Sequence, residues 1–445
     1  MAKALGTQAR VRLLAWATPA VVFLALLGVL TLANRPSGPS PPGAEGVRPS
    51  LARQPVALDT EGRISQLQAA VRADPSDAGS YALLGDAYYQ RARETGDPAY
   101  YTRADDSFAA ALSRDPSNVT AVTGQATLAL ARHDFRRGLE LAERARKLAP
   151  QLASPYAPLA DAQVELGRYG DAARTLDRLV RLKANLTAYA RISYFRELHG
   201  DLRGALRAMR LAVSAGAGGP EANAFVQGLL GKLLADQGRY GAAEHAYREA
   251  LATDPHYPPA LSGLAGLEAG RGEFGPAIRR YREVVRRLPL PEYAVALSEA
   301  EEAAGRIAAA NRDYALVGAE AKLLRANGVN TDVDLALFEA NHGDPARAVI
   351  LGRSAWRQAP SIRSTDAYSW ALYKAGRIGL ASWFSERAMK LGSRDPSFLY
   401  HAGMIARRDG RAGEARRLLG ILVGQAPRFS PLYGPRARRA LEALQ

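Results

Sequence analysis

The chain has 445 residues, of which 47% are hydrophobic and 23% are charged, a composition that excludes disorder of the whole chain. It has no cysteine, which excludes a disulfide framework, a thiolate nucleophile and a cysteine-based zinc site. Lysine and arginine outnumber aspartate and glutamate by 59 to 44, which indicates either an anionic partner or simply a basic proteome.

The first predicted element is an apolar helix. Residues 13–33, LLAWATPAVVFLALLGVLTLA, carry no charge and follow a basic N-terminal flank, residues 1–12. As a helix they would rise by about 30 Å, the thickness of the hydrocarbon core of a bilayer. The pattern predicts a single-pass transmembrane signal-anchor helix, with the N-terminus in the cytoplasm and the rest of the chain outside it. A cleaved signal peptide, which would leave a secreted protein, is the alternative, because the run ends in small residues.

A linker follows the predicted anchor. Residues 34–59 are rich in proline, glycine and serine and show no apolar period. We expect an extended spacer that holds the folded part away from the membrane surface.

Beyond the linker, the sequence repeats at intervals of 33 to 38 residues. A glycine recurs between two amphipathic stretches, where the end of a helix favours a left-handed backbone. An alanine stands five residues after each glycine, where a small side chain lets two helices approach closely. The pairs are Gly167 and Ala172, Gly200 and Ala205, Gly238 and Ala243, Gly272 and Ala277, Gly305 and Ala310, Gly343 and Ala348, Gly376 and Ala381, and Gly410 and Ala415. The unit is therefore predicted to be a helical hairpin.

The helix that follows each glycine has one apolar face. Larger apolar residues stand four residues after the alanine, as at Leu176, Tyr247 and Tyr281, and another apolar column follows three residues later. Spacing of three and four residues describes a single buried helix face. Prolines such as Pro150 and Pro255 end many of these helices, because proline cannot continue a helix.

These repeats resemble the tetratricopeptide repeat family. The clearest first-helix match is YALLGDAYY, which begins at Tyr81. The clearest second-helix match has the family's small, aromatic, small and proline places at Ala243, Tyr247, Ala250 and Pro255. The resemblance implies an all-α fold, a right-handed superhelical α-solenoid of about ten helix-turn-helix repeats over residues 60–429, with residues 430–445 as a capping helix. It also implies that the first helices line a concave groove that binds peptides or partner proteins.

The register of the family places several side chains on that groove, among them Lys232 and Glu299. An aromatic cluster with one charge lies near the C-terminus, and such residue types are enriched in binding hot spots. The candidate partner-binding residues are Trp370, Tyr373, Tyr400, Met404 and Arg407. Packing between the last two repeats is the alternative role for this cluster.

We expect no enzyme activity, no cofactor and no metal site. The predicted repeats leave no room for a separate catalytic domain after the linker, and the chain has no G-x-x-x-x-G-K-[ST], H-E-x-x-H or G-x-S-x-G motif. No two of the six histidines stand at ligand spacing on one helix. His133, His199 and His342 fall at hairpin turns, where we expect solvated, structural roles.

The sequence therefore predicts a membrane-anchored scaffold that binds a protein or peptide through its concave groove. The alternative is a basic solenoid that docks on anionic lipid or an envelope polymer, based on basic clusters such as IRRYREVVRR. Nucleic acid is not expected as a partner, because aromatic residues are not interleaved with these charges and the solenoid is predicted to lie outside the cytoplasm.

Overall fold

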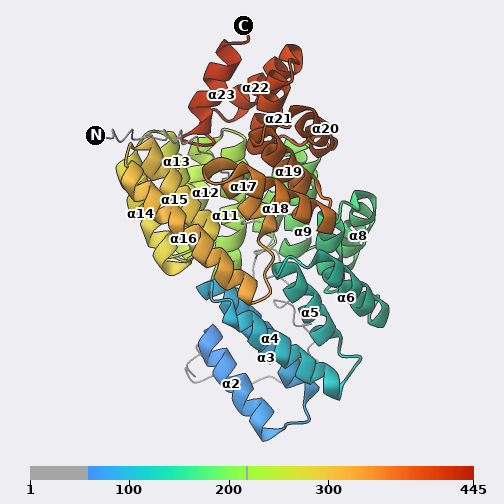
Figure 1. Cartoon of the computed structure of the whole chain (residues 1–445). Coiled ribbons are helices and arrows are strands. Elements are labelled where there is room, and N and C mark those ends of the chain that lie inside the picture. The colour runs from blue at the N-terminus through green and yellow to red at the C-terminus, as the bar shows by residue number, and fades with distance from the viewer. Residues whose placement is uncertain (1–58, 217–218) are drawn as a thin grey trace, which may run out of the picture.

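The computed structural model describes residues 59–216 and 219–445. These residues form 22 α-helices and no strand, which confirms the predicted all-α class (Figure 1). The predicted basic flank, the transmembrane helix at residues 13–33 and the linker up to residue 58 lie outside the described residues. Among the helices that the structure describes, none has the length and apolar character needed to cross a membrane.

Twenty of the described helices pair into ten antiparallel hairpins, as the repeat predicts. In chain order the pairs are α3 (Ala78–Thr95) and α4 (Ala99–Arg114), α5 (Val119–Ala131) and α6 (Phe135–Leu148), α7 (Tyr156–Glu165) and α8 (Tyr169–Leu182), α9 (Leu186–Leu198) and α10 (Leu202–Ser214), α11 (Pro220–Asp236) and α12 (Tyr240–Thr253), α13 (Pro258–Gly270) and α14 (Phe274–Arg287), α15 (Pro291–Ala303) and α16 (Ile307–Ala326), α17 (Asp332–His342) and α18 (Pro345–Gln358), α19 (Ile362–Lys374) and α20 (Ile378–Ala388), and α21 (Pro396–Arg408) and α22 (Ala412–Gln425). A helix precedes the array, α2 (Thr60–Ala73), and another follows it, α23 (Tyr433–Glu442).

The recurring alanines lie where the two helices of a hairpin meet. All eight are at most 1% exposed, so the predicted close approach of the helices is confirmed. Seven of the eight glycines have a positive φ and end the first helix in the predicted left-handed conformation.

Gly343 is the exception to the left-handed turn, with a φ of −127°. The carboxylate of Glu339 accepts a hydrogen bond from the backbone N–H of Asp344 at 3.0 Å, in place of the backbone carbonyl five residues earlier that accepts this bond in turns such as that of Gly167. In the α5–α6 turn the glycine's place is taken by His133, which has a φ of +59°. Gly96, in the α3–α4 turn, is also left-handed, so the sequence pattern misses two left-handed turn residues and predicts one that is not there.

The row of hairpins winds back onto itself, so that α17 to α19 lie against α5 to α9 (Figure 1). Hydrogen bonds across this contact join residues far apart in sequence. The Nδ1 atom of His133 lies 2.6 Å from the carbonyl oxygen of Asn330, 197 residues later. The hydroxyl of Tyr169 accepts from the N–H of Ile362, 193 residues later. Further along, the N–H of Arg428 donates to the Tyr240 hydroxyl, 188 residues earlier. One superhelical turn thus takes about 190 residues.

We call this contact the interturn seam. It joins the hairpin turns near residues 96, 133, 167, 200 and 238 to the segments near residues 288, 330, 360, 392 and 425. A Cβ atom added at Gly167 would lie 2.7 Å from the carbonyl oxygen of Pro360, and one added at Gly238 would overlap the carbonyl oxygen of Gln425. By contrast, a Cβ at Gly376 or Gly410, beyond the reach of the seam, would meet nothing within 4 Å.

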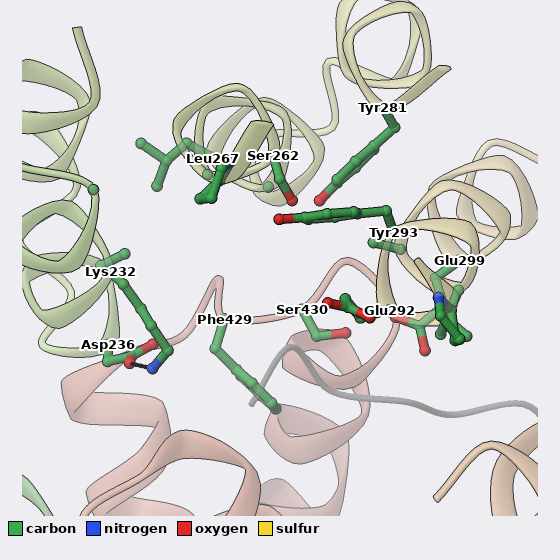
Figure 2. A pocket seen from close by; sticks show the side chains of 18 of the residues that line it. Lys232, Asp236, Ser262, Leu267, Tyr281, Glu292, Tyr293, Glu299, Phe429 and Ser430 are labelled. Carbon is green, nitrogen blue, oxygen red and sulfur yellow. Dashed lines mark hydrogen bonds and ion pairs between the residues drawn. The ribbon is translucent and has the colours of Figure 1, made fainter. Parts of the chain in front are cut away.

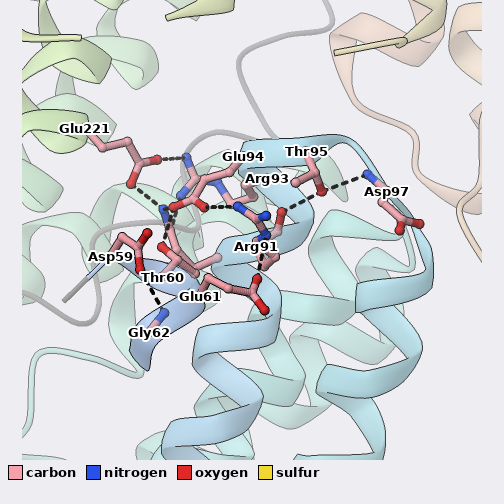
Figure 3. A network of polar contacts seen from close by, with 11 residues as sticks. Asp59, Thr60, Glu61, Gly62, Arg91, Arg93, Glu94, Thr95, Asp97 and Glu221 are labelled. Atoms are coloured by element: carbon pink, nitrogen blue, oxygen red, sulfur yellow. Dashed lines mark hydrogen bonds and ion pairs between the residues drawn. The ribbon is translucent and has the colours of Figure 1, made fainter. Parts of the chain in front are cut away.

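A polar network fixes the N-terminal end of the array (Figure 3). The Arg91 guanidinium lies 3.3 Å from the Glu61 carboxylate and so joins α3 to α2. Next to it, the buried guanidinium of Arg93 lies 3.1 Å from the carboxylate of Glu221 at the start of α11. The first hairpin is therefore tied both to the preceding helix and to the fifth hairpin.

Candidate functional site

The closed superhelix has a cavity of about 200 Å³ on its concave side (Figure 2). First helices α11, α13, α15 and α17 line it, together with the tyrosines of α12 and α14 and the segment 428–431 between α22 and α23. We call this cavity the lumen pocket. Lys232 and Glu299, which the family register places on the groove, are both part of its wall.

Aromatic rings form much of the wall of the lumen pocket. Tyr247, Tyr257, Tyr281, Tyr293 and Phe429 line it, and Figure 2 shows the hydroxyl ends of Tyr281 and Tyr293 directed toward Ser262. Burial raises the pKa of all four tyrosines, so their hydroxyls remain protonated and able to donate hydrogen bonds. The result is an apolar surface with polar tips, the kind of lining that ligand pockets use.

The Tyr247 ring is placed by two glycines. A Cβ atom added at Gly231 on α11 or at Gly263 on α13 would overlap this ring, so the ring needs both glycines in order to lie across the two helices. The predicted apolar column of the second helices therefore supplies core residues that also reach the pocket.

Polar side chains gather at the end of the pocket formed by α15 and α17. Glu292 lies in the first turn of α15, and burial raises its pKa to about 8, with the charge of Asp334 raising it further. The Oδ1 atom of Asp334 is buried and has no hydrogen-bond partner. Thr331 occupies the N-cap position of α17, yet its hydroxyl makes no capping bond and no other hydrogen bond, although the residue is only 3% exposed.

Glu299, the next carboxylate along α15, is already engaged. The Nε2 atom of His342 lies 3.3 Å from its carboxylate. Burial lowers the pKa of His342 to about 3, so this histidine is neutral and not a counter-charge at neutral pH.

The opposite end of the pocket holds a cluster of ionisable groups. The Lys232 ammonium lies 2.5 Å from the carboxylate of Asp236 and 3.8 Å from that of Glu197. Burial lowers the pKa of Lys232, but these carboxylates outweigh that effect and raise it above its ordinary value. Glu197, Asp236 and Asp395 have oxygens within 4.8 Å of one another, a spacing compatible with a metal ion. The lysine ammonium supplies the cation there, so the cluster acts as an ion-pair network of the seam.

The five predicted partner-binding residues do lie together at the C-terminal end of the array, but at different depths. Trp370 and Tyr400 are 1% and 2% exposed. Tyr373 and Met404 are half-buried against the same cluster, and Arg407 is exposed. A partner's access to this cluster therefore runs through Tyr373, Met404 and Arg407.

Trp370 is fixed by neighbours on three sides. Its Nε1–H donates to the Oδ1 atom of Asn341 at 2.7 Å. Its ring stacks on those of Tyr373 and His401, with centroids 4.8 and 4.2 Å apart, and the edge of Tyr400 meets it at 5.7 Å. Tyr400 in turn packs on Tyr433 of α23. The alternative role, packing between the last repeats, thus accounts for the two largest rings.

The histidines are less exposed than the sequence predicts. The side chain of His342 is only 2% exposed, and burial lowers the pKa of His133, so the expectation of solvated roles is wrong for these two. His401, on α21, forms a buried pair with Asp366, with Nδ1 and Oδ2 2.8 Å apart. His133 sits at the interturn seam, for which hairpin periodicity gives no signal, whereas His342 and His401 lie between the first helices of neighbouring hairpins.

Residues 234–300, which run from the end of α11 through most of α15, match the model of the tetratricopeptide repeat family. This match supports the predicted repeats over the helices that line the lumen pocket. No curated protein matches the sequence.

Several solved structures resemble the chain. The human IFIT1 dimer with m7Gppp-AAAA is 16% identical, with 74% of this chain and 76% of that chain covered and a TM-score of 0.47. The APC/C hetero-tetramer Cut9-Hcn1 is 16% identical, with coverage of 87% and 83% and a TM-score of 0.38. YrrB, a TPR protein with an unusual peptide-binding site, is 19% identical, with coverage of 44% and 97% and a TM-score of 0.28.

Proposed function

We propose that the chain is a scaffold that binds an extended segment of a partner protein in the lumen pocket. The observation that carries this function is the lining of the pocket, in which eight aromatic residues stand beside polar atoms that form no hydrogen bond with any described residue. A pocket with apolar walls and a few fixed polar groups binds and orients a ligand. A stack of helical hairpins is suited to this use, because it presents a long shaped surface.

We further propose that the chain acts by binding and not by catalysis. The hairpins from α3 to α22 fill residues 78–425 without a separate domain in the described ranges. The histidines that approach carboxylates at His342 and His401 are buried in helix packing, which suits a structural role.

The location of the scaffold is also a proposal. Residues 13–33 would anchor the chain in a membrane, with the solenoid outside the cytoplasm, and residues 34–59 would be the spacer. The N-terminal sequence of the mature protein, purified from host membranes, tests this. A mature chain that begins after residue 33 would show cleavage and a secreted protein instead.

Photo-crosslinking from the pocket tests the binding function. A photoreactive residue at Ser262, in the pocket, is compared with one at Leu380, on the exposed face of α20 at 52% exposure, each in the full chain in host membranes. We expect Ser262 to crosslink one discrete partner segment that mass spectrometry can map, and Leu380 not to do so. Adducts from Leu380 alone, or from neither position, would contradict binding in the lumen pocket.

The second candidate function is docking on anionic lipid, and α20 carries the observation that favours it. Trp383 is 45% exposed, and the Arg387 guanidinium lies 3.0 Å from the centroid of its ring. Exposed Trp, Leu and Arg side chains together suit a membrane interface. Co-sedimentation with phosphatidylglycerol vesicles, and not with phosphatidylcholine vesicles, should be lost in Trp383→Ala. Binding that is the same for both vesicle types would rule the lipid function out.

A further inference from the structure

We infer that the bound segment places a lysine or arginine side chain in the lumen pocket, with its cationic end between Glu292, Asp334 and Thr331. This inference rests on the proposed function and names the chemistry of the ligand. It concerns the α15–α17 end of the pocket, which is separate from the C-terminal cluster around Trp370.

The charges of the pocket wall are the first support. Its basic side chains are Lys232 and Arg428, and Lys232 is already paired with Asp236. Within the described ranges, no lysine or arginine forms an ion pair with Glu292 or Asp334. Arg363 and His133 face Asp334 from across the seam, whereas no basic side chain of the pocket wall pairs with Glu292. In a chain with a net charge of +15, this end of the pocket is therefore rich in carboxyl groups, and a cation of the ligand would add a counter-charge on the pocket side.

The unsatisfied polar atoms are the second and independent support. The Thr331 hydroxyl and the Asp334 Oδ1 atom are buried without a hydrogen-bond partner. Buried polar groups in folded proteins are normally hydrogen-bonded, so each such atom needs a reason. The carboxylate oxygen of Asp334 is an acceptor, the Thr331 hydroxyl can accept as well as donate, and a guanidinium or ammonium group brings only donors. The two sets match.

The aromatic walls complete the fit. Tyr257, Tyr281 and Tyr293 line the same pocket as Glu292 and Asp334. The alkyl stem of lysine or arginine packs on such faces while its charged end reaches a polar site, and the ring faces themselves attract a cation. An acidic side chain would add a like charge beside Asp334 and would disfavour ionisation of Glu292, and an apolar one would leave the buried polar atoms unsatisfied.

Proton linkage gives the inference a distinctive readout. The groups that face Glu292 are Asp334 from α17, Glu320 from α16 and Tyr101 from α4, and Asp334 in turn faces His133 and Arg363 across the seam. Because burial raises the pKa of Glu292 to about 8, its carboxyl is mostly protonated at pH 7. A bound cation would stabilise the carboxylate, lower this pKa and release a proton. The affinity for a cation should therefore rise as the pH rises from 6.5 to 8.5.

The test uses the full chain in detergent and four five-residue alanine peptides with lysine, arginine, norleucine or glutamate at the centre. Titration calorimetry in buffers of different ionisation heats measures both affinity and proton release. We expect the lysine or arginine peptide to bind about tenfold more tightly than the norleucine peptide, with proton release, and the glutamate peptide to bind least. Equal binding of lysine and norleucine peptides, or no effect of pH, would overturn the cationic ligand and leave crosslinking from Ser262 to judge the proposed function.

Two substitutions locate the effect. Glu292→Gln and Asp334→Asn keep the side-chain shape and remove charge, so they should fold and should weaken only the lysine and arginine peptides, by about tenfold. Glu273→Gln, at an exposed carboxylate outside the pocket, is the matched control and should change nothing. Butylamine tests whether a free amine is sufficient. If butylamine bound as tightly as the lysine peptide, the inference that the ligand is a peptide segment would be wrong. Undiminished lysine binding in both pocket variants would overturn the site.

Discussion

The interturn seam predicts that the same substitution has different effects at two equivalent turns. Gly238 and Gly410 both end a first helix with a positive φ, at +68° and +79°. Alanine in this conformation costs about 1–2 kcal/mol at either position. At Gly410 the new Cβ meets nothing within 4 Å, whereas at Gly238 it overlaps the backbone carbonyl of Gln425. That carbonyl belongs to the main chain, so the seam itself must shift.

The additional cost at Gly238 follows from the contacts that would move. Overpacking against a fixed neighbour costs about 1–3 kcal/mol. The nearby bonds from Gln425 Nε2 to the Asp236 carbonyl, at 2.8 Å, and from the Arg428 N–H to the Tyr240 hydroxyl, at 2.9 Å, contribute about 1 kcal/mol each. Gly238→Ala should therefore lose about 1–3 kcal/mol more unfolding free energy than Gly410→Ala.

Urea unfolding of the full chain in detergent, followed by circular dichroism, compares the two variants. Hydrogen exchange locates the effect, because an opened seam exposes the amides of Gln425, Ala426 and Arg428 before the rest of the chain unfolds. Faster exchange there in Gly238→Ala, and not in Gly410→Ala, is the expected result. Equal destabilisation of the two variants with unchanged exchange at residues 425–428 would refute the seam.

Three further predictions concern buried polar groups. Trp370→Phe leaves the Oδ1 atom of Asn341 without its donor and should lower the unfolding free energy by about 1–3 kcal/mol, measured in urea. Asp366→Ala removes the partner of the buried His401 and should cost a similar amount; no change would show that the pair contributes nothing. Since burial raises the pKa of Glu292 from 4.5 to about 8, folding keeps a proton that the unfolded chain releases, and stability falls as the pH rises through this range. Glu292→Gln should therefore melt at a higher temperature than the unsubstituted chain at pH 8 and at the same temperature near pH 4.5.

The hairpins could be predicted from sequence because their constraints are local and repeat. Ala243 and its seven counterparts must be small for two helices to meet, and Gly238 must be left-handed for the chain to turn, so the same residue types recur. The pattern fails at Gly343, because the side chain of Glu339, and not its backbone carbonyl, accepts the hydrogen bond of the turn. The pattern also fails to predict the left-handed His133, because the ring of His133 contacts Asn330, 197 residues away.

Only part of the candidate site could be predicted. The family register correctly places Lys232 and Glu299 on the concave side, because each first helix has a fixed face. It gives no information on segment 428–431, which closes the pocket from a region without repeats. Nor does it predict that Tyr433 of α23 covers Tyr400, which removes that ring from the surface. Binding at Tyr373, Met404 and Arg407 stays a prediction.

The interturn seam also changes how the chain should respond to loss of its ends. In an open array each hairpin contacts only its neighbours, so a truncation is felt one unit away. Here Arg428, beyond the tenth hairpin, bonds to Tyr240 in the fifth, and Ile362 at the start of α19 bonds to Tyr169 in the third. The stability of a hairpin at the seam thus depends on the adjacent hairpins in sequence and also on the hairpins one superhelical turn away. Removing the last hairpin should loosen the middle of the protein, and mechanical extension should begin with one cooperative rupture.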